Sequence, residues 1–354
     1  MRRLLFVTIL LVVLAFSLSI AQKLTFLLAP KSLNNPYWFA VENGMKDAAA
    51  KLKVEAYFDA PVEADAAKQA EKILSYIVKG VNGIGISPND PEAIKVVITR
   101  ALEKGIPVIT FDSDSPGSGR YVYIGTDNYR AGYEAGKLMA QLIEKYRANK
   151  DTIKLAILTG GLAAFNLNER IRGFKDALAE YSAKSNKKIV YVADPFPCDD
   201  DTAKAIQLIR DAMRKYTDLD GWFMSGGWPL FAPKETVISA LGGPEKVKEL
   251  LVVGFDTLIP ELELVQAGAV KGLVGQRPYD MGYLSIEVLY RMATQGVQAT
   301  LQNIEKIAAE FGKKVTKVEE DGKVAYIIDT GVDVVTQENV DEFFEYAKKI
   351  YTKR

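Results

Sequence analysis

The chain has 354 residues, with 45 basic and 45 acidic side chains, 48% hydrophobic residues, one cysteine and no histidine. A formal net charge of zero argues against a nucleic-acid partner, and the single cysteine, Cys198, excludes an intrachain disulfide. The lack of histidine removes the commonest general base and metal ligand. We therefore predict no catalytic residue, no metal site and no cofactor.

Residues 1–21 have the layout of a signal peptide. Two arginines precede an apolar stretch over residues 4–16, and Ser19 and Ala21 are the small residues that such a peptide carries before its cleavage point. The alternative is an N-terminal membrane anchor, but the apolar stretch is shorter than the roughly 20 residues that a spanning helix needs. The mature chain, from Gln22, is expected to be soluble, monomeric and located in the periplasm or extracytoplasmic space.

After residue 22, short β-rich runs alternate with amphipathic helical runs. Alternation of this kind is typical of parallel sheets with helices on both faces. Strands are predicted at 24–29, 54–58, 83–87, 107–111 and 121–124, with helices at 38–52, 65–78 and 93–104.

The second half of the chain repeats the pattern, which favours two similar three-layer αβα domains over one wide sheet. Its strands are predicted at 153–158, 189–192, 221–225, 251–255 and 270–274, and its helices at 168–181, 203–216, 236–241 and 281–292. An Asp-Gly turn at 321–322, a strand at 324–328 and a last helix at 338–351 follow.

Candidate binding residues of the first domain follow its first and fourth strands, because ligands lie at the carboxyl ends of parallel strands. Asn35, Tyr37 and Trp38 offer an amide for hydroxyl groups and aromatic rings for the apolar face of a sugar, although Trp38 could equally be a core residue. Asp112, at the end of the 107–111 strand, can accept two hydrogen bonds from adjacent hydroxyls; a helix cap is its alternative role.

The second domain offers a matching set. Asn166 and Arg170 are four residues apart and share a face if a helix has begun. Asp256 follows its strand as Asp112 does, which predicts two aspartates on opposite walls of one cleft. Gln276 can donate and accept, and Trp228, after a Gly-Gly turn that leaves room for a ligand, can stack on a ring. The alternatives are a surface salt bridge for Arg170, a cap for Asp256 and plain turns for Gln276 and Trp228.

In this order and spacing, eight short stretches resemble the periplasmic sugar-binding proteins of ABC transporters, in the ribose/galactose/xylose/glucose group. The stretches are Asn34-Asn35-Pro36-Tyr37-Trp38, Asn82-Gly83-Ile84, Gly105-Ile106-Pro107-Val108, Phe111-Asp112, Asp127-Asn128, Arg170-Ile171-Arg172-Gly173-Phe174, Gly254-Phe255-Asp256 and Gly275-Gln276-Arg277-Pro278.

The resemblance implies a type I periplasmic-binding fold with a three-strand hinge. It implies one lobe from 22–127 plus 277–328 and a second from 128–276 plus 329–354. It also implies that sugar is contacted by Asn35, Tyr37, Trp38, Asp112, Arg170, Asp256 and Gln276.

The expected function is capture of a monosaccharide or cyclitol, such as glucose, xylose or myo-inositol, and its delivery to a membrane permease. An exported glycosidase and a soluble sugar sensor for a chemoreceptor are the alternatives. A sugar-sensing transcription regulator would need an N-terminal DNA-binding segment, where this chain carries the predicted signal peptide.

Overall fold

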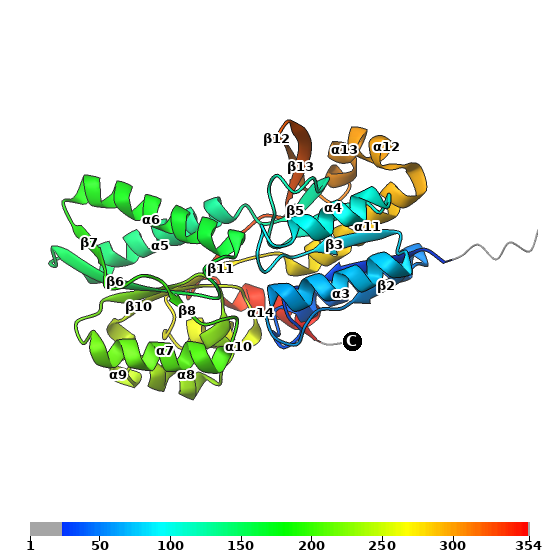
Figure 1. The fold of residues 1–354 in the computed structure, drawn as a ribbon. Coiled ribbons are helices and arrows are strands. Elements are labelled where there is room, and N and C mark those ends of the chain that lie inside the picture. The colour runs from blue at the N-terminus through cyan, green and yellow to red at the C-terminus, as the bar shows by residue number, and fades with distance from the viewer. Residues whose placement is uncertain (1–22, 353–354) are drawn as a thin grey trace, which may run out of the picture.

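A computed structural model describes residues 23–352; the predicted signal peptide lies outside them. The described chain forms two lobes (Figure 1). Each lobe is built on its own sheet, which is covered by its own set of helices. The sheet of the first lobe has the order β12-β13-β5-β4-β3-β1-β2. Its strands are β1 (Thr25–Ala29), β2 (Glu55–Phe58), β3 (Gly83–Ile86), β4 (Val108–Phe111), β5 (Val122–Gly125), β12 (Lys314–Glu320) and β13 (Lys323–Asp329).

The sheet of the second lobe has the order β14-β11-β10-β9-β6-β7, with β8 paired to β6. In this sheet, every pair of neighbouring strands is parallel except β11 with β14. In the first sheet, every pair is parallel except β12 with β13. Its strands are β6 (Thr152–Thr159), β7 (Lys188–Tyr191), β8 (Phe196–Pro197), β9 (Gly221–Met224), β10 (Leu251–Phe255), β11 (Gly272–Gly275) and β14 (Asp333–Thr336). The predicted α/β class with two parallel-sheet domains is confirmed.

Helices cover both faces of both sheets, and alternate residues along each strand go to opposite faces. On β1, Phe26 and Leu28 join the core beneath α2 (Trp38–Leu52) and α11 (Pro278–Gln295). Leu27 and Ala29 join the core beneath α3 (Ala66–Lys79) and α4 (Lys95–Glu103). The second lobe repeats the scheme, with α5 (Asn128–Tyr146) and α6 (Phe165–Ser185) on one face and α7 (Thr202–Lys215), α8 (Lys234–Ala240) and α10 (Ile259–Gln266) on the other.

The chain passes between the lobes at three places: from β5 to α5, from β11 to α11, and from β13 to β14. Thr126 in the first passage donates its hydroxyl to Gln276 Oε1 in the second at 3.2 Å. Polar side chains at the passages are therefore hydrogen-bonded to one another.

Several elements were not predicted from the sequence, including β8, β14, α10 and the helix and strand described next. The 19-residue helix α5 was not predicted, although Asp127 caps it by accepting from the Arg130 backbone N–H. Strand β12, before the Asp-Gly turn, is mostly exposed and polar and so lacks an apolar pattern. Short helices α9 (Pro244–Glu249), α12 (Val297–Gln302) and α13 (Ile304–Ala309) and the 3-10 turn η1 (Trp228–Phe231) complete the described chain.

The last helix, α14 (Asp341–Tyr351), begins later than the sequence predicted and lies where the lobes meet (Figure 1). Its apolar side joins the core of the second lobe through Val340 and Ala347. Its C-terminal end is held by the first lobe, where Asn43 Nδ2 on α2 donates to the carbonyl oxygens of Ile350 at 2.9 Å and Thr352 at 2.7 Å. Helix α14 thus connects the two lobes in addition to the three chain passages.

Candidate functional site

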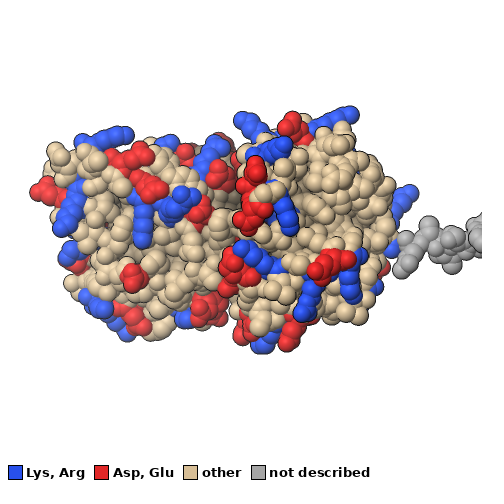
Figure 2. Space-filling model, turned by 45° about the horizontal axis from the view of Figure 1, so that its top comes forward, with Lys and Arg blue, Asp and Glu red and all other residues tan. Residues whose placement is uncertain are grey.

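A small cavity of about 30 Å³ lies between the lobes, at the carboxyl ends of the strands. Figure 2 shows the furrow that separates the lobes on one face, with acidic and basic side chains interspersed around it. All nine residues that the sequence nominated line this cavity: Asn35, Tyr37, Trp38, Asp112, Asn166, Arg170, Trp228, Asp256 and Gln276.

Asp112 and Asp256 occupy equivalent positions in the two lobes. Asp112 follows β4 with φ 59°, and Asp256 follows β10 with φ 75°. Each backbone N–H donates to the neighbouring strand, from Asp112 to Ile124 O at 3.2 Å and from Asp256 to Val274 O at 3.0 Å. The left-handed backbone is uncommon for residues other than glycine, asparagine and aspartate. Each lobe therefore ends one central strand with the same turn and aims a carboxylate into the cavity.

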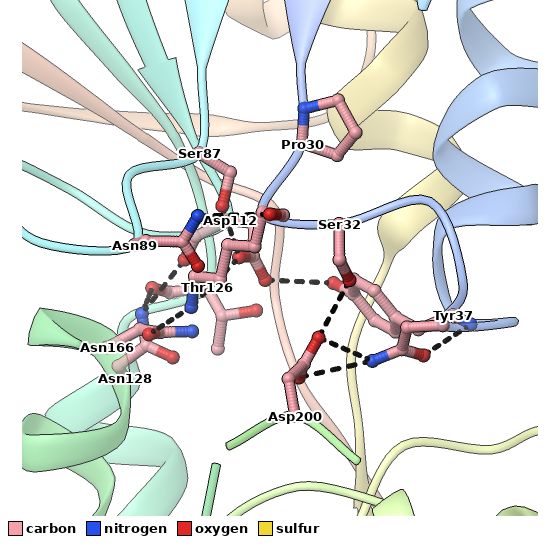
Figure 3. Close-up of polar contacts among 12 residues, drawn as sticks. Pro30, Ser32, Tyr37, Ser87, Asn89, Asp112, Thr126, Asn128, Asn166 and Asp200 are labelled. Carbon is pink, nitrogen blue, oxygen red and sulfur yellow. Dashed lines mark hydrogen bonds and ion pairs between the residues drawn. The ribbon is translucent and has the colours of Figure 1, made fainter. Parts of the chain in front are cut away.

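Asp112 is the polar centre of the first wall. Its Oδ2 accepts from Ser87 Oγ at 2.7 Å and its Oδ1 from Tyr37 Oη at 3.2 Å (Figure 3). Burial, reinforced by the charge of Asp112, raises the pKa of Tyr37 well above its ordinary value, so the phenol stays a neutral donor.

The aromatic residues of this wall, Tyr37 and Trp38, pack in the core of the first lobe and also line the cavity. Tyr37 is fixed at the start of α2 because its N–H donates to Asn35 Oδ1 at 2.9 Å. Trp38 lies edge-on to Tyr37 and to Phe111, and its buried Nε1 has no hydrogen-bond partner among the described residues. Trp38 is therefore a core residue that also lines the cavity.

The second wall is a chain of hydrogen bonds that begins at Arg170. Its guanidinium donates to Asn128 Oδ1 at 2.9 Å, to the Ser225 carbonyl oxygen at 2.8 Å and to Gln276 Oε1 at 2.7 Å. Gln276 Nε2 in turn donates to Asp256 Oδ1 at 2.6 Å. The Arg170 side chain is buried and stacks over the Phe255 ring, so it is not a surface salt bridge. This arrangement fixes the orientation of every polar group that it contains.

Lys31, two residues beyond β1, is a cavity residue that sequence reasoning missed. Its Nζ donates to Asn166 Oδ1 on the opposite lobe at 2.8 Å and lies 3.7 Å from Asp112 Oδ2. Burial lowers the pKa of Lys31, and the negative charge of Asp112 partly offsets this. Its position directly after a strand was the available signal.

Asp200 is the second missed residue, hidden in the run Asp199-Asp200-Asp201. Asp201 is the N-cap of α7. Asp200 instead accepts from Ser32 Oγ at 2.9 Å across the lobes (Figure 3). It also accepts from the Asn35 amide and the Trp228 indole N–H. Burial raises the pKa of Asp200, and the charge of Lys31 opposes that shift.

The segment 226–228 differs from the sequence expectation that its glycines leave room for a ligand. A Cβ at Gly226 would lie 2.4 Å from the Trp228 ring, and a Cβ at Gly160 would lie equally close to it. A Cβ at Gly227 would lie 2.1 Å from Glu261 Oε1. The glycines therefore make room for the Trp228 indole and the Glu261 carboxyl, and the indole edge reaches the cavity.

Comparisons with known proteins agree with this geometry. Residues 26–298 match the family described as periplasmic binding protein domain, so the chain belongs to the periplasmic binding protein family. It resembles the type I sugar-binding members associated with ABC transporters, which confirms the family and fold predicted from the sequence.

Among curated proteins, the chain is 28% identical to the ribose import binding protein of Haemophilus influenzae, over 77% of this chain and 87% of that one. Among solved structures, it is similar to a solute-binding protein of Burkholderia graminis in complex with D-arabinose, with a TM-score of 0.73 and 31% identity over 91% of this chain and 98% of that one. A glucose-galactose binding protein of Geobacillus stearothermophilus gives a TM-score of 0.72 and 25% identity over 90% and 99% of the two chains.

Residues 23–352 contain no candidate membrane span and no candidate metal site. None of the helices in that range has both the length and the apolar character to cross a bilayer. Within the same range, no three or more Asp, Glu or Cys side chains are grouped so that they could hold a metal ion.

Proposed function

We propose that the chain captures a monosaccharide or a cyclitol between its lobes and delivers it to the membrane permease of an ABC transporter. The observation that carries the proposal is the pair of aspartates, Asp112 and Asp256, which end equivalent strands of the two lobes and both line one cavity. Carboxylates accept strong charge-assisted bonds from hydroxyl groups, and Arg170 and Gln276 supply matching donors.

The proposed mechanism is closure about a hinge. The lobes, 22–127 plus 277–328 and 128–276 plus 329–354, would rotate about the three passages, with ligand bound first to one wall. Bonds across the cleft, such as Lys31 to Asn166 and Ser32 to Asp200, would then favour the closed form. The permease would read the closed surface of a monomeric protein exported by its signal peptide.

The sugar specificity is proposed to lie within the range of the relatives, which are named for ribose, allose, arabinose and glucose-galactose, together with xylose and myo-inositol. All of these offer several hydroxyl groups on a ring. A buried polar group left unpaired by a missing hydroxyl would supply the discrimination.

A thermal-shift panel of these sugars and myo-inositol, followed by titration calorimetry of each ligand that raises the melting temperature, tests the proposal. A ligand that binds only the folded state stabilises it, by about 2.7 kcal/mol at 100 times its Kd. An unchanged melting temperature with every compound would contradict sugar capture.

The enzymatic alternative has its own test. We propose that no reaction occurs, because Asp112 and Asp256 are held in hydrogen bonds as acceptors. Turnover of an aryl glycoside by the purified chain would favour a glycosidase, which needs an acid/base carboxyl pair. A role as a chemoreceptor's sugar sensor would share the same binding step.

A further inference from the structure

A second cavity adjoins the candidate site and is larger than it. The groove has a volume of about 210 Å³. It shares Lys31, Leu167 and Asp200 with the site cavity, so those side chains stand between the two spaces.

Part of the wall of the groove on the second lobe has small side chains or none. Gly160, Gly161, Ala163 and Ala164 line it, between β6 and α6. A Cβ at Gly161 would have no atom within 4 Å, whereas a Cβ at Gly160 would collide with the Trp228 ring. Gly160 is thus needed to pack Trp228, but packing does not explain Gly161, which borders open space.

The opposite wall belongs to the first lobe and is polar. Asn89 is fixed there because its Nδ2 donates to the Lys31 carbonyl oxygen at 3.0 Å and its N–H donates to Gln69 Oε1 at 3.1 Å. Asn89 Oδ1 accepts no hydrogen bond from any described residue. Ala64 lies beside it in the groove lining.

The groove therefore combines hydroxyl-binding chemistry with an apolar surface. The Lys31 ammonium and the Asp200 carboxylate lie at its inner end, and Asp199 lies at its rim. Leu162, which is 61% exposed, gives the rim an apolar side chain on which the C–H face of a sugar ring can pack. Both walls suit a second polyhydroxylated unit better than an alkyl chain or an anion.

We propose that the site takes a sugar that carries a second sugar unit, with one ring between Asp112 and Asp256 and the other in the groove between Asn89 and Gly161. The proposal rests on the proposed function, because the first ring occupies the sugar site itself. It extends the ligand class from free monosaccharides to disaccharides and similar glycosides.

The test compares each monosaccharide with disaccharides built from it, by titration calorimetry on the mature chain. The probes are D-glucose with cellobiose and maltose, D-xylose with xylobiose, and D-galactose with lactose. Two variants narrow the groove from opposite lobes: Gly161→Phe and Ala64→Phe. Ala67→Phe, at an exposed position of α3 outside the groove lining, is the control for an added ring.

The proposal expects the wild type to bind at least one disaccharide within about tenfold of its monosaccharide. Gly161→Phe and Ala64→Phe should each weaken disaccharide binding at least tenfold, which is about 1.4 kcal/mol, and change monosaccharide binding less than twofold. Ala67→Phe should bind both ligand types like the wild type.

The other outcomes separate the two proposals. Binding of a monosaccharide with no binding of any disaccharide would overturn the groove proposal and leave sugar capture standing. Equal losses for both ligand types in the two phenylalanine variants would also overturn it. If neither these probes nor any compound of the thermal-shift panel binds to the wild type, sugar capture itself fails, and the groove proposal fails with it.

Discussion

The left-handed backbone of Asp112 decides which substitutions can test its role. Asparagine tolerates a positive φ nearly as well as aspartate, whereas alanine adds strain to the loss of the carboxylate. Asp112→Asn therefore removes the charge while keeping the turn after β4. Tyr37 and Ser87 donate to different carboxylate oxygens, so only one of them keeps an oxygen acceptor in this variant.

We predict that Asp112→Asn weakens binding of the sugar identified in the panel by about 1–3 kcal/mol, the usual worth of a charged hydrogen-bonding group. Titration calorimetry measures the loss, and urea denaturation checks that the fold is intact. Asp321→Asn is the matched control, because Asp321 also has a positive φ, of 48°, but lies exposed in the β12–β13 turn. Equal affinity of Asp112→Asn and the wild type would remove Asp112 from the site.

The buried carboxyl group of Glu261, near Asp256 of the cavity, should make the stability of the fold depend on pH. Its side chain is fully buried, Oε2 accepts from the Leu258 N–H at 2.7 Å, and Oε1 has no described partner. Burial, followed by the charge of Asp256, raises the pKa of Glu261 well above its ordinary value of 4.5. Tyr351 of α14 also faces this pair.

A raised pKa means that the folded state holds its proton to a higher pH than the unfolded state does. Its contribution to the free energy of unfolding is therefore complete below the unfolded-state pKa and is lost as the pH rises through the folded-state pKa. We predict that Glu261→Gln loses less stability than the wild type between about pH 5 and pH 8. Urea denaturation at both pH values measures this. Glu338→Gln, at an exposed position, is the control, and parallel pH profiles of wild type and Glu261→Gln would refute the prediction.

At the residue scale, the rule that ligands lie beyond the carboxyl ends of parallel strands located every nominated cavity residue. It missed Lys31 and Asp200 for different reasons. A lysine near a strand end is usually a solvated charge, and three consecutive aspartates do not show which one caps the helix and which one turns inward. Only the pairing of segments distant in sequence, as between Ser32 and Asp200, separates those roles.

At the scale of elements, each lobe is held together by one pair of closely packed helices. In the first lobe, a Cβ at Gly282 on α11 would lie 1.9 Å from the Val41 carbonyl oxygen on α2. In the second lobe, a Cβ at Gly173 on α6 would lie 2.1 Å from the Tyr129 carbonyl oxygen on α5. The helix backbones approach so closely that only glycine fits at these crossings.

Gly282→Ala sets two effects against each other. Alanine favours a helix interior by about 1 kcal/mol relative to glycine, but the added methyl must push two backbones apart. Overpacking of this kind costs about 1–3 kcal/mol or more, so we predict a net loss of unfolding free energy in urea. Gly161→Ala, whose methyl meets open space, is the control and should be close to neutral. A Gly282→Ala variant more stable than the wild type would show that the helices can separate at no cost.

Period-two and helical patterns predicted most elements, because each has one face in a core. Helix α5 was missed because small residues replace the usual large apolar ones where it meets α6, including Ala131, Gly132, Ala135 and Gly136. Close packing therefore removed the apolar signal on which a sequence prediction depends.

At the scale of the whole molecule, α14 connects both lobes beside the three passages. Arg277 in the second passage stacks over the Tyr346 ring of this helix, and Asn43 of the first lobe holds its C-terminal carbonyls. Any change in the angle between the lobes must break or move these contacts. We therefore expect α14 to stabilise one arrangement of the lobes.

We predict that Asn43→Ala costs about 1–3 kcal/mol of unfolding free energy, since it leaves two carbonyls without their buried donor. It should also enlarge the radius of gyration of the sugar-free protein in small-angle scattering and weaken sugar binding. Gln266→Ala is the control, because Gln266 donates to Asp341 of α14 from within the second lobe, at an exposed position. If Asn43→Ala lowers the free energy of unfolding but leaves the radius of gyration unchanged, Asn43 stabilises the fold without setting the arrangement of the lobes.

The two ends of the described chain suit different uses in a biosensor. Lys23 opens the chain just before β1, and in Figure 1 that end leaves the first lobe away from the second. Thr352 leaves from the junction, where its carbonyl is bonded to Asn43. Immobilisation on the N-terminal side of Lys23 would therefore leave the lobes free to move. A fluorophore attached beyond Thr352 would lie at the junction, where a change in the angle between the lobes alters its surroundings.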